Sequence, residues 1–155
     1  MKIKIITVSK TKSEYSQAES EFLKRLRQYA DIEILNLKEE PITKNRNYDE
    51  IMEIEGDKIL DKLDKEYFNI ALHVMGQQKT SEEFANLLEE IKDFKGGKIC
   101  FIIGGPLGLS QKVLAGADLV LSFSKMTFTH QLIRLLLLEQ VYRGFEILKG
   151  TDYHK

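Results

Sequence analysis

Two segments in the last third of the chain have the composition of a small-molecule site. The first, Gly104–Gly108 (GGPLG), follows the strongly apolar run Lys98–Ile103. If that run is a buried strand, the glycines place backbone N–H and C=O groups where open α/β folds bind ligands, with no Cβ in the way. The segment lacks the spacing of a dinucleotide fingerprint and the Lys-Ser/Thr of a P-loop. A plain tight turn is therefore an equally simple interpretation.

The second segment, Ser124–Thr129 (SKMTFT), precedes a long apolar helix pattern that begins at His130. Free amides and small hydroxyls can recognise an adenine edge and an amino-acid moiety, while Met126 and Phe128 can pack against the base. The hydroxyl residues can equally serve as the N-cap of the helix. A lone histidine at a helix start is more often structural than catalytic, so His130 is a secondary candidate.

A third group lies at the C-terminus. Tyr153, His154 and Lys155, together with Arg143 in the preceding helix pattern, provide an aromatic ring, an imidazole and cations. Such a set suits stacking on an RNA base and holding a phosphate. The alternative is a solvated chain end without a role in chemistry, since chain ends are commonly frayed.

Other kinds of site are not supported. His73, His130 and His154 stand far apart and no Cys/His cluster has ligand spacing, so we expect no metal. A G-x-S-x-G elbow for a serine hydrolase is absent. Cys100 lies inside an apolar run, where a thiol usually acts as a small hydrophobe.

Composition favours a cytoplasmic protein that has no membrane partner. The single cysteine cannot form an internal disulfide, and neither a signal-peptide pattern nor an apolar stretch of ~20 residues is present. The net charge of −1 hides a split, with seven Lys/Arg against three Asp/Glu in residues 1–30 and six against twelve in residues 31–66. Residues 121–155 carry five Lys/Arg against three Asp/Glu. Both basic ends permit RNA contact, although a solvated acidic face explains the split equally well.

Strand and helix patterns alternate along the chain, as in an α/β layer structure with a largely parallel sheet and a single domain over 1–155. We expect strands at 2–8, 32–37, 68–75, 98–103 and 118–123. We expect helices after the capping-box sequences Thr11–Glu14 and Thr80–Glu83, over 49–63, near 111–115 and over 130–148, with a loop at 38–48 and a turn at 76–80.

The final helix pattern is apolar around most of its circumference, a feature carried by Leu132, Ile133, Leu135, Leu136, Leu137, Leu138 and Val141. A one-sided surface helix has a narrower apolar stripe. The helix is therefore either buried in its own domain or shared with a second subunit. In so small a domain we favour a homodimer.

The stretches FIIGGPLGLS, LSFSKMTFTHQLIRLLLLEQVYRGFEILKG and the terminal YHK, in this order, resemble the RlmH family of the SPOUT methyltransferases. MKIKIITVSK and IMEIEGDKIL also look like that family, so the resemblance covers the whole chain. Thr129 stands where the family often has proline, and Leu107 where a polar residue is common. Neither departure removes a group that the chemistry needs.

The resemblance implies a mainly parallel sheet flanked by helices, with a C-terminal trefoil knot over about residues 98–155, and a homodimer. It implies S-adenosyl-L-methionine as cofactor, held largely by backbone groups of Leu72, Gly104, Ser124, Lys125, Met126, Thr127, Phe128 and Thr129. The implied reaction is methylation at N3 of a pseudouridine in the helix 69 hairpin of 23S rRNA in the large ribosomal subunit.

The proton on N3 has to leave, so a base is expected. His154 and Tyr153 are the first candidates and His130 is the alternative, while Arg143 would hold a phosphate or the charge on the uracil oxygens. Two other functions stay open from the sequence. One is a SPOUT methyltransferase that acts on tRNA, and the other is a non-catalytic ribosome-associated binding protein.

Overall fold

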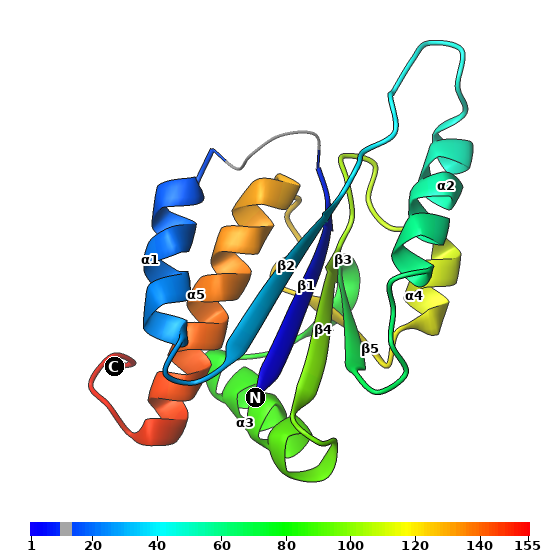
Figure 1. The fold of residues 1–155 in the computed structure, drawn as a ribbon. Helices are drawn as coiled ribbons and strands as arrows, with labels where there is room; N and C mark the ends of the chain where they lie inside the picture. The colour runs from blue at the N-terminus through cyan, green and yellow to red at the C-terminus, as the bar shows by residue number, and fades with distance from the viewer. Residues whose placement is uncertain (10–13) are drawn as a thin grey trace.

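The computed structural model describes residues 1–9 and 14–155. Its centre is a five-stranded sheet in the order β2-β1-β4-β3-β5, in which all neighbours are parallel (Figure 1). The strands are β1 (Lys2–Val8), β2 (Asp31–Leu37), β3 (Phe68–Gln78), β4 (Lys98–Ile103) and β5 (Leu119–Ser122). The predicted α/β fold with a parallel sheet is confirmed. The knot stays a prediction of the family resemblance.

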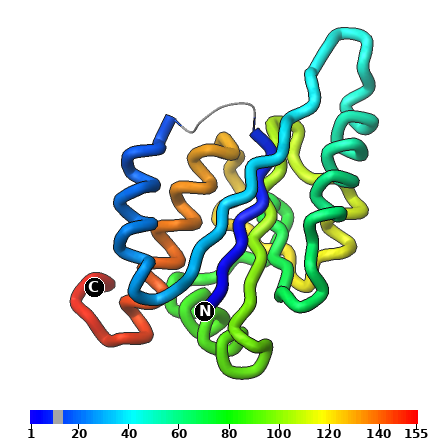
Figure 2. Tube along the Cα trace, viewed as in Figure 1, coloured from blue at the N-terminus to red at the C-terminus, as the bar shows by residue number. Residues whose placement is uncertain are grey.

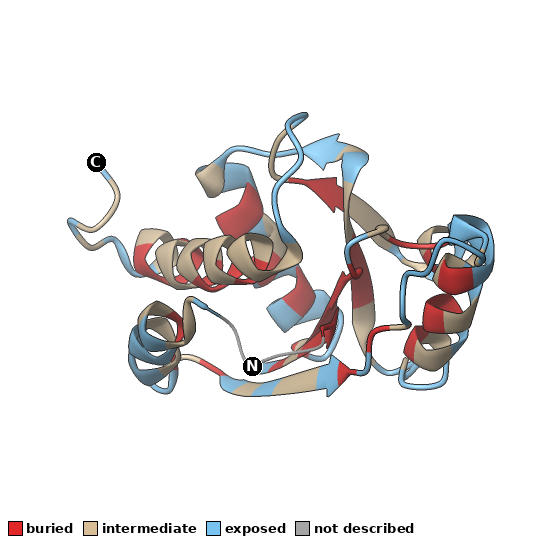
Figure 3. Ribbon diagram, turned by 90° about the horizontal axis from the view of Figure 1, so that it is seen from above, coloured by how far each residue is buried: buried red, intermediate tan, exposed pale blue. Residues whose placement is uncertain are grey.

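Helices cover both faces of the sheet (Figures 1 and 3). They are α1 (Ser16–Leu26), α2 (Tyr48–Leu60), α3 (Ser81–Phe94), α4 (Gln111–Gly116) and α5 (His130–Lys149). One apolar core joins the sheet to α1, α3 and α5, and a second joins it to α2 and α4. None of the helices in the described parts of the chain is long and apolar enough to cross a membrane.

The alternation of side chains along β1 explains why its second half, Ile5–Val8, is almost continuously apolar. Ile3 and Ile5 belong to the core under α1, α3 and α5, whereas Ile6 and Val8 belong to the core under α2 and α4. Strands of parallel sheets that are buried on both faces have this pattern. The two cores therefore fix the sheet from both sides.

The structure tests one of the two predicted capping boxes. The capping box at Thr80 is confirmed, because its hydroxyl accepts from Glu83 N while the Glu83 carboxylate accepts from Thr80 N at 2.8 Å. The other predicted capping box begins in residues 10–13, which lie outside the described residues. Here α1 begins at Ser16, after Tyr15, with no side-chain cap.

Two predicted boundaries were wrong. β3 does not end at Met75 in a turn, because Gln77 and Gln78 resume pairing with β5 and the strand runs through Gln78. α2 ends at Leu60 instead of residue 63, since two successive turns follow it before β3. The longer β3 matters for function, because its irregular part reaches the pocket described below.

A buried ion pair anchors α5 to the neighbouring helix α1. Arg134 donates from Nε and Nη2 to the two carboxylate oxygens of Glu19, both at 2.9 Å, and from Nη1 to Asn36 Oδ1 at 3.1 Å. Both charged side chains are 7% exposed. The guanidinium thus joins α5 to α1 by a bidentate contact and to β2 by a third hydrogen bond.

We predict that Glu19→Gln lowers the free energy of unfolding by about 3–5 kcal/mol, because it leaves the buried Arg134 charge without a counterion. The matched control is Glu21→Gln on the same helix, which removes an ion pair to Lys24 whose partners are more than half exposed. The control substitution should lower the free energy of unfolding by about 1 kcal/mol or less. Urea unfolding at fixed protein concentration measures both, and equal losses would contradict the prediction.

Candidate functional site

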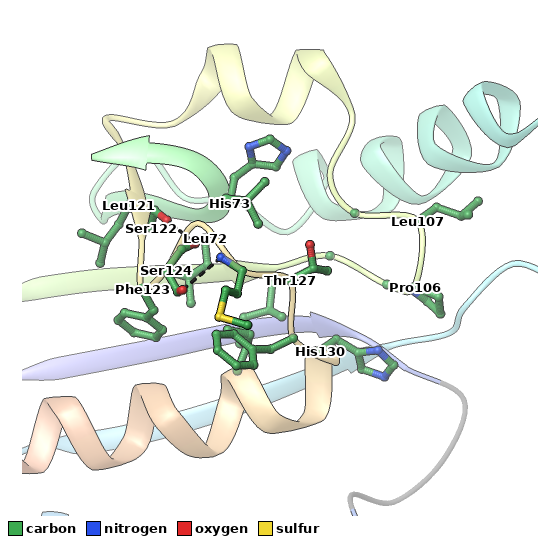
Figure 4. Close-up of a pocket in the computed structure, with 18 residues that line it drawn as sticks. Leu72, His73, Pro106, Leu107, Leu121, Ser122, Phe123, Ser124, Thr127 and His130 are labelled. Atoms are coloured by element: carbon green, nitrogen blue, oxygen red, sulfur yellow. Dashed lines mark hydrogen bonds between the residues drawn. The ribbon is translucent and has the colours of Figure 1, made fainter. Parts of the chain in front are cut away.

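A pocket of about 250 Å³ opens at the carboxyl edge of the sheet. Its lining comes from the middle of β3, the ends of β4 and β5 with the loops that follow them, and the first turn of α5, at residues 72–74, 103–108, 121–124, 126–128, 130 and 133. Figure 4 shows Leu72 and His73 on one side and Pro106 and Leu107 on the other. Ligands of open α/β sheets bind at this edge, and the volume is near the lower end of the ~300–1,000 Å³ typical of small-molecule sites.

The first wall is an irregular part of β3. Pairing with β5 runs to Leu72, is interrupted, and resumes at Gln77 opposite the same residue, Leu121. The intervening residues 73–76 leave the ladder, and Met75 N donates to His73 Nδ1 at 3.3 Å. Gly76 returns the strand so close to β5 that a Cβ on it would lie 2.6 Å from Leu121 C. The wall therefore depends on a glycine at this crossing.

The second wall is the loop 104–108, folded back on itself. Gly108 N donates to Gly105 O at 3.0 Å, and Gly108 has a φ of +91°. A Cβ on Gly104 would lie 2.5 Å from both C and O of Gly108. The loop therefore presents bare backbone to the pocket, as the glycine-rich sequence predicted. Behind it stands the buried Glu55, and this burial raises the pKa of its carboxyl.

The third wall is the loop after β5, closed by short side-chain bonds. Ser122 Oγ donates to Ser124 O at 2.8 Å, and Met126 N donates to Ser124 Oγ at 3.0 Å (Figure 4). Of the candidate N-cap residues, Thr129 is the one used, since its hydroxyl accepts from Leu132 N. The Met126 side chain is left 72% exposed at the pocket mouth.

The pocket gathers most of the residues predicted to hold the cofactor. Those in its lining are Leu72, Gly104, Ser124, Met126, Thr127 and Phe128. Lys125 and Thr129 are not in the lining. His73 and Ile133 also line the pocket, although the sequence analysis did not propose them as site residues. The local sequence gave no signal for His73, because the bulge that brings it to the pocket arises from tertiary contact.

His130 lies at the margin of the pocket, where Figure 4 shows its ring turned away from Ser124. Burial is the main cause that lowers the pKa of its imidazole, against a weaker opposing effect of Glu39. The imidazole is therefore mostly neutral at pH 7 and can accept a proton. Within residues 1–9 and 14–155, no group of three or more His, Cys, Asp or Glu side chains is arranged to hold a metal ion.

The remaining predicted residues form a separate cluster at the far end of α5. Arg143 donates from Nε and Nη2 to Glu139 Oε1 at 3.0 and 2.5 Å, and Tyr153 OH donates to the same oxygen at 3.2 Å. The guanidinium lies 4.8 Å from the centre of the Tyr153 ring. His154 bonds through Nε2 to Glu82 at 2.8 Å and lies 3.4 Å from Arg143.

The structure does not bring this tail cluster (Arg143, Tyr153 and His154) to the pocket of its own chain. His130 begins α5 and Arg143 follows thirteen residues later, so the two are ~20 Å apart along the helix at 1.5 Å per residue. Figure 1 shows the C-terminus at the opposite end of α5 from the 104–108 loop. The predicted set of catalytic residues is therefore divided between two places.

Comparison with known proteins gives consistent results. A family model described as "Predicted SPOUT methyltransferase" matches residues 1–154. Relatives from Bacillus pumilus (strain SAFR-032) and Bacillus thuringiensis (strain Al Hakam) are 45% and 46% identical over 159 aligned residues, which cover all of this chain and of each relative. Both relatives are named Ribosomal RNA large subunit methyltransferase H.

Among solved structures, a probable methylase family protein from Haemophilus influenzae Rd KW20 superposes with a TM-score of 0.53. It is 12% identical, and the match covers 99% of this chain and 70% of that one. At this identity the likeness shows a shared fold and nothing about substrate.

We predict that Gly76→Ala destabilises the protein by about 1–3 kcal/mol, because the new methyl group would overlap the β5 backbone. The control is Gly116→Ala in α4, where a Cβ would meet only Leu60 Cδ2 at an ordinary 3.7 Å. That change should be neutral or stabilise by up to about 1 kcal/mol. Thermal or urea unfolding checks both, and an unchanged Gly76→Ala protein would disprove the close crossing.

Proposed function

The chain belongs to the SPOUT methyltransferase family, and on this premise we propose that it methylates N3 of a pseudouridine in the helix 69 hairpin of 23S rRNA. S-adenosyl-L-methionine is the methyl donor in this proposal, and the cytoplasm is the place of action. The observation that carries the proposal is the pocket at the carboxyl edge of the sheet, which is lined by glycines and hydroxyl side chains. The chain is also similar over its full length to relatives that are named for rRNA methylation.

The residues present fit the proposed cofactor. Gly104 has no room for a side chain, because a Cβ would lie 2.5 Å from the Gly108 backbone, and the loop 104–108 therefore offers bare backbone donors and acceptors to a ligand. Leu72 and Phe128 supply apolar surface for a purine, while Ser124 and Thr127 supply hydroxyl groups. When bound, S-adenosyl-L-methionine would supply a methyl group already activated on a sulfonium.

The chain then has to orient the uracil ring and accept the N3 proton. Glu139 holds the Arg143 guanidinium and the Tyr153 hydroxyl in a fixed relation, so both can face an RNA group together. Burial, followed by the charge of Glu139, raises the pKa of Tyr153, so its hydroxyl stays a donor at neutral pH. His154 and His130 remain the candidate bases, and Arg143 is the group to neutralise charge on a uracil oxygen.

A homodimer would unite the two halves of this site. In one chain the tail cluster is ~20 Å or more from the pocket, yet both are parts of one reaction. Leu132, Leu135 and Leu136 are only half-buried on α5, which leaves an apolar face for a second copy. We therefore propose that the tail cluster of one subunit completes the pocket of the other.

The deciding experiment is transfer of labelled methyl groups from S-adenosyl-L-methionine to ribosomes that lack the modification, followed by identification of the modified nucleoside. N3-methylpseudouridine from 23S rRNA is the expected product. A methylated tRNA nucleoside would instead identify a tRNA enzyme. Saturable cofactor binding without any transfer would leave a non-catalytic binding protein.

We predict that two inactive variants restore activity when their subunits are mixed. Thr127→Trp should fill the pocket from an exposed loop position, and Arg143→Ala should disable the tail cluster. Co-expressed subunits form mixed dimers in half of all pairings, and each has one intact pocket facing one intact tail, so about a quarter of wild-type activity should return.

Recovery in the mixture is the outcome that supports a shared site. If pocket and tail of the same chain worked together, every mixed dimer would stay inactive. Each variant alone is the control, together with analytical ultracentrifugation to show that both still form dimers.

A further inference from the structure

A cluster of cations outside the pocket and tail lies where α1 and α5 end. Arg25 is in the last turn of α1, Arg27 is its C-cap, and Lys149 is the last residue of α5. Figure 2 shows the two helices side by side, ending at the same edge of the molecule as the C-terminus. All three side chains are exposed. We call these three residues the α1–α5 basic surface.

Aromatic rings lie between the cations and hold them in place. The Arg25 guanidinium lies 5.7 Å from the centre of the Tyr142 ring and 5.6 Å from that of Phe22. The Lys149 ammonium lies 5.7 Å from the centre of Tyr29. A cation held against a ring loses less conformational freedom when it binds a phosphate. The surface is therefore partly preorganised.

These three cations form no close ion pairs with acidic side chains of the described residues. Within residues 1–9 and 14–155, neither arginine nor Lys149 has a carboxylate within ion-pairing distance, whereas the adjacent Lys24 pairs with Glu21. The nearby Glu146 is buried and accepts from Tyr29 and Thr151. Hydrogen bonds from Thr151 and Tyr29, and more weakly the charge of Lys149, lower the pKa of the Glu146 carboxyl, but Glu146 forms no ion pair with Lys149. The surface thus keeps its positive charge in a protein whose total charge is −1.

The basic surface is continuous with the tail cluster. The Tyr142 ring, which faces Arg25, packs edge-on against Tyr153 at 4.9 Å, and Tyr153 in turn faces Arg143. A nucleic acid that placed one base against the tail cluster would therefore have its neighbouring phosphates over Arg25. Alternating cations and rings are the combination that binds RNA backbones and unstacked bases.

We propose that the α1–α5 basic surface, made of Arg25, Arg27 and Lys149, docks the phosphate backbone of the ribosomal RNA beside the target nucleotide. This inference rests on the proposed function, and it adds a binding surface that is remote from the cofactor. A simpler role would be to stabilise the negative ends of two helix dipoles. The two roles differ in salt dependence, because only phosphate contacts release counterions from RNA.

The test compares Arg25→Ala/Arg27→Ala with the control Lys62→Ala/Lys65→Ala, which removes two exposed cations from the turn between α2 and β3. Affinity for ribosomes lacking the modification is measured from about 50 to about 200 mM salt. Two lost phosphate contacts should flatten the salt slope by about 1.4–1.8, so wild type should lose roughly 7- to 12-fold more affinity over this range than the variant. Arg25→Lys/Arg27→Lys should restore the slope.

Three results would overturn the proposal: a salt slope equal to that of the control, loss of cofactor binding, or dissociation of the dimer in the alanine variant. The last two would show a structural role. Failure of the proposed function is a different outcome, because wild type itself would then neither bind nor methylate the ribosomes.

Discussion

The buried pair of Arg134 and Glu19 is the contact on which both halves of the site depend. It lies one turn beyond the start of α5, so it fixes the helix end that supports the 124–129 loop. The same rigid helix carries the tail cluster away from that point. With Asn36 as third partner, the guanidinium also ties α5 to β2. A shift of this ion pair would move both the α5 residues that line the pocket and the tail cluster at the other end of the same helix.

In the proposed function, the fold separates cofactor binding from RNA contact. Glycine loops and strand ends build an apolar, backbone-lined pocket, whereas the ends of α1 and α5 gather cations and aromatic rings. Separation has a physical benefit, because a dry site and a phosphate-binding surface need opposite environments. In the proposed homodimer, a symmetric pair of chains would bring the two environments together.

Much of the site was predictable because its signals are local. The loop 104–108 and the segment 124–129 follow apolar strands, and the carboxyl ends of parallel strands meet at one edge. The bulge at 73–76 was not predictable, since it depends on how closely Gly76 meets β5. Nor could sequence reveal that Glu82 holds the tail, because His154 and Glu82 are 72 positions apart.

The large sequence separation between contacting residues also affects how the chain folds. Arg134 and Glu19 are 115 residues apart, and β1 pairs with β4, which follows almost a hundred residues later. Closing such long loops costs entropy before the contacts form, so chains with this contact order fold slowly. Since α5 packs against both α1 and α3, no shorter fragment retains a complete core. We therefore expect this chain to fold as one cooperative unit, through a late and rate-limiting docking of its last helix.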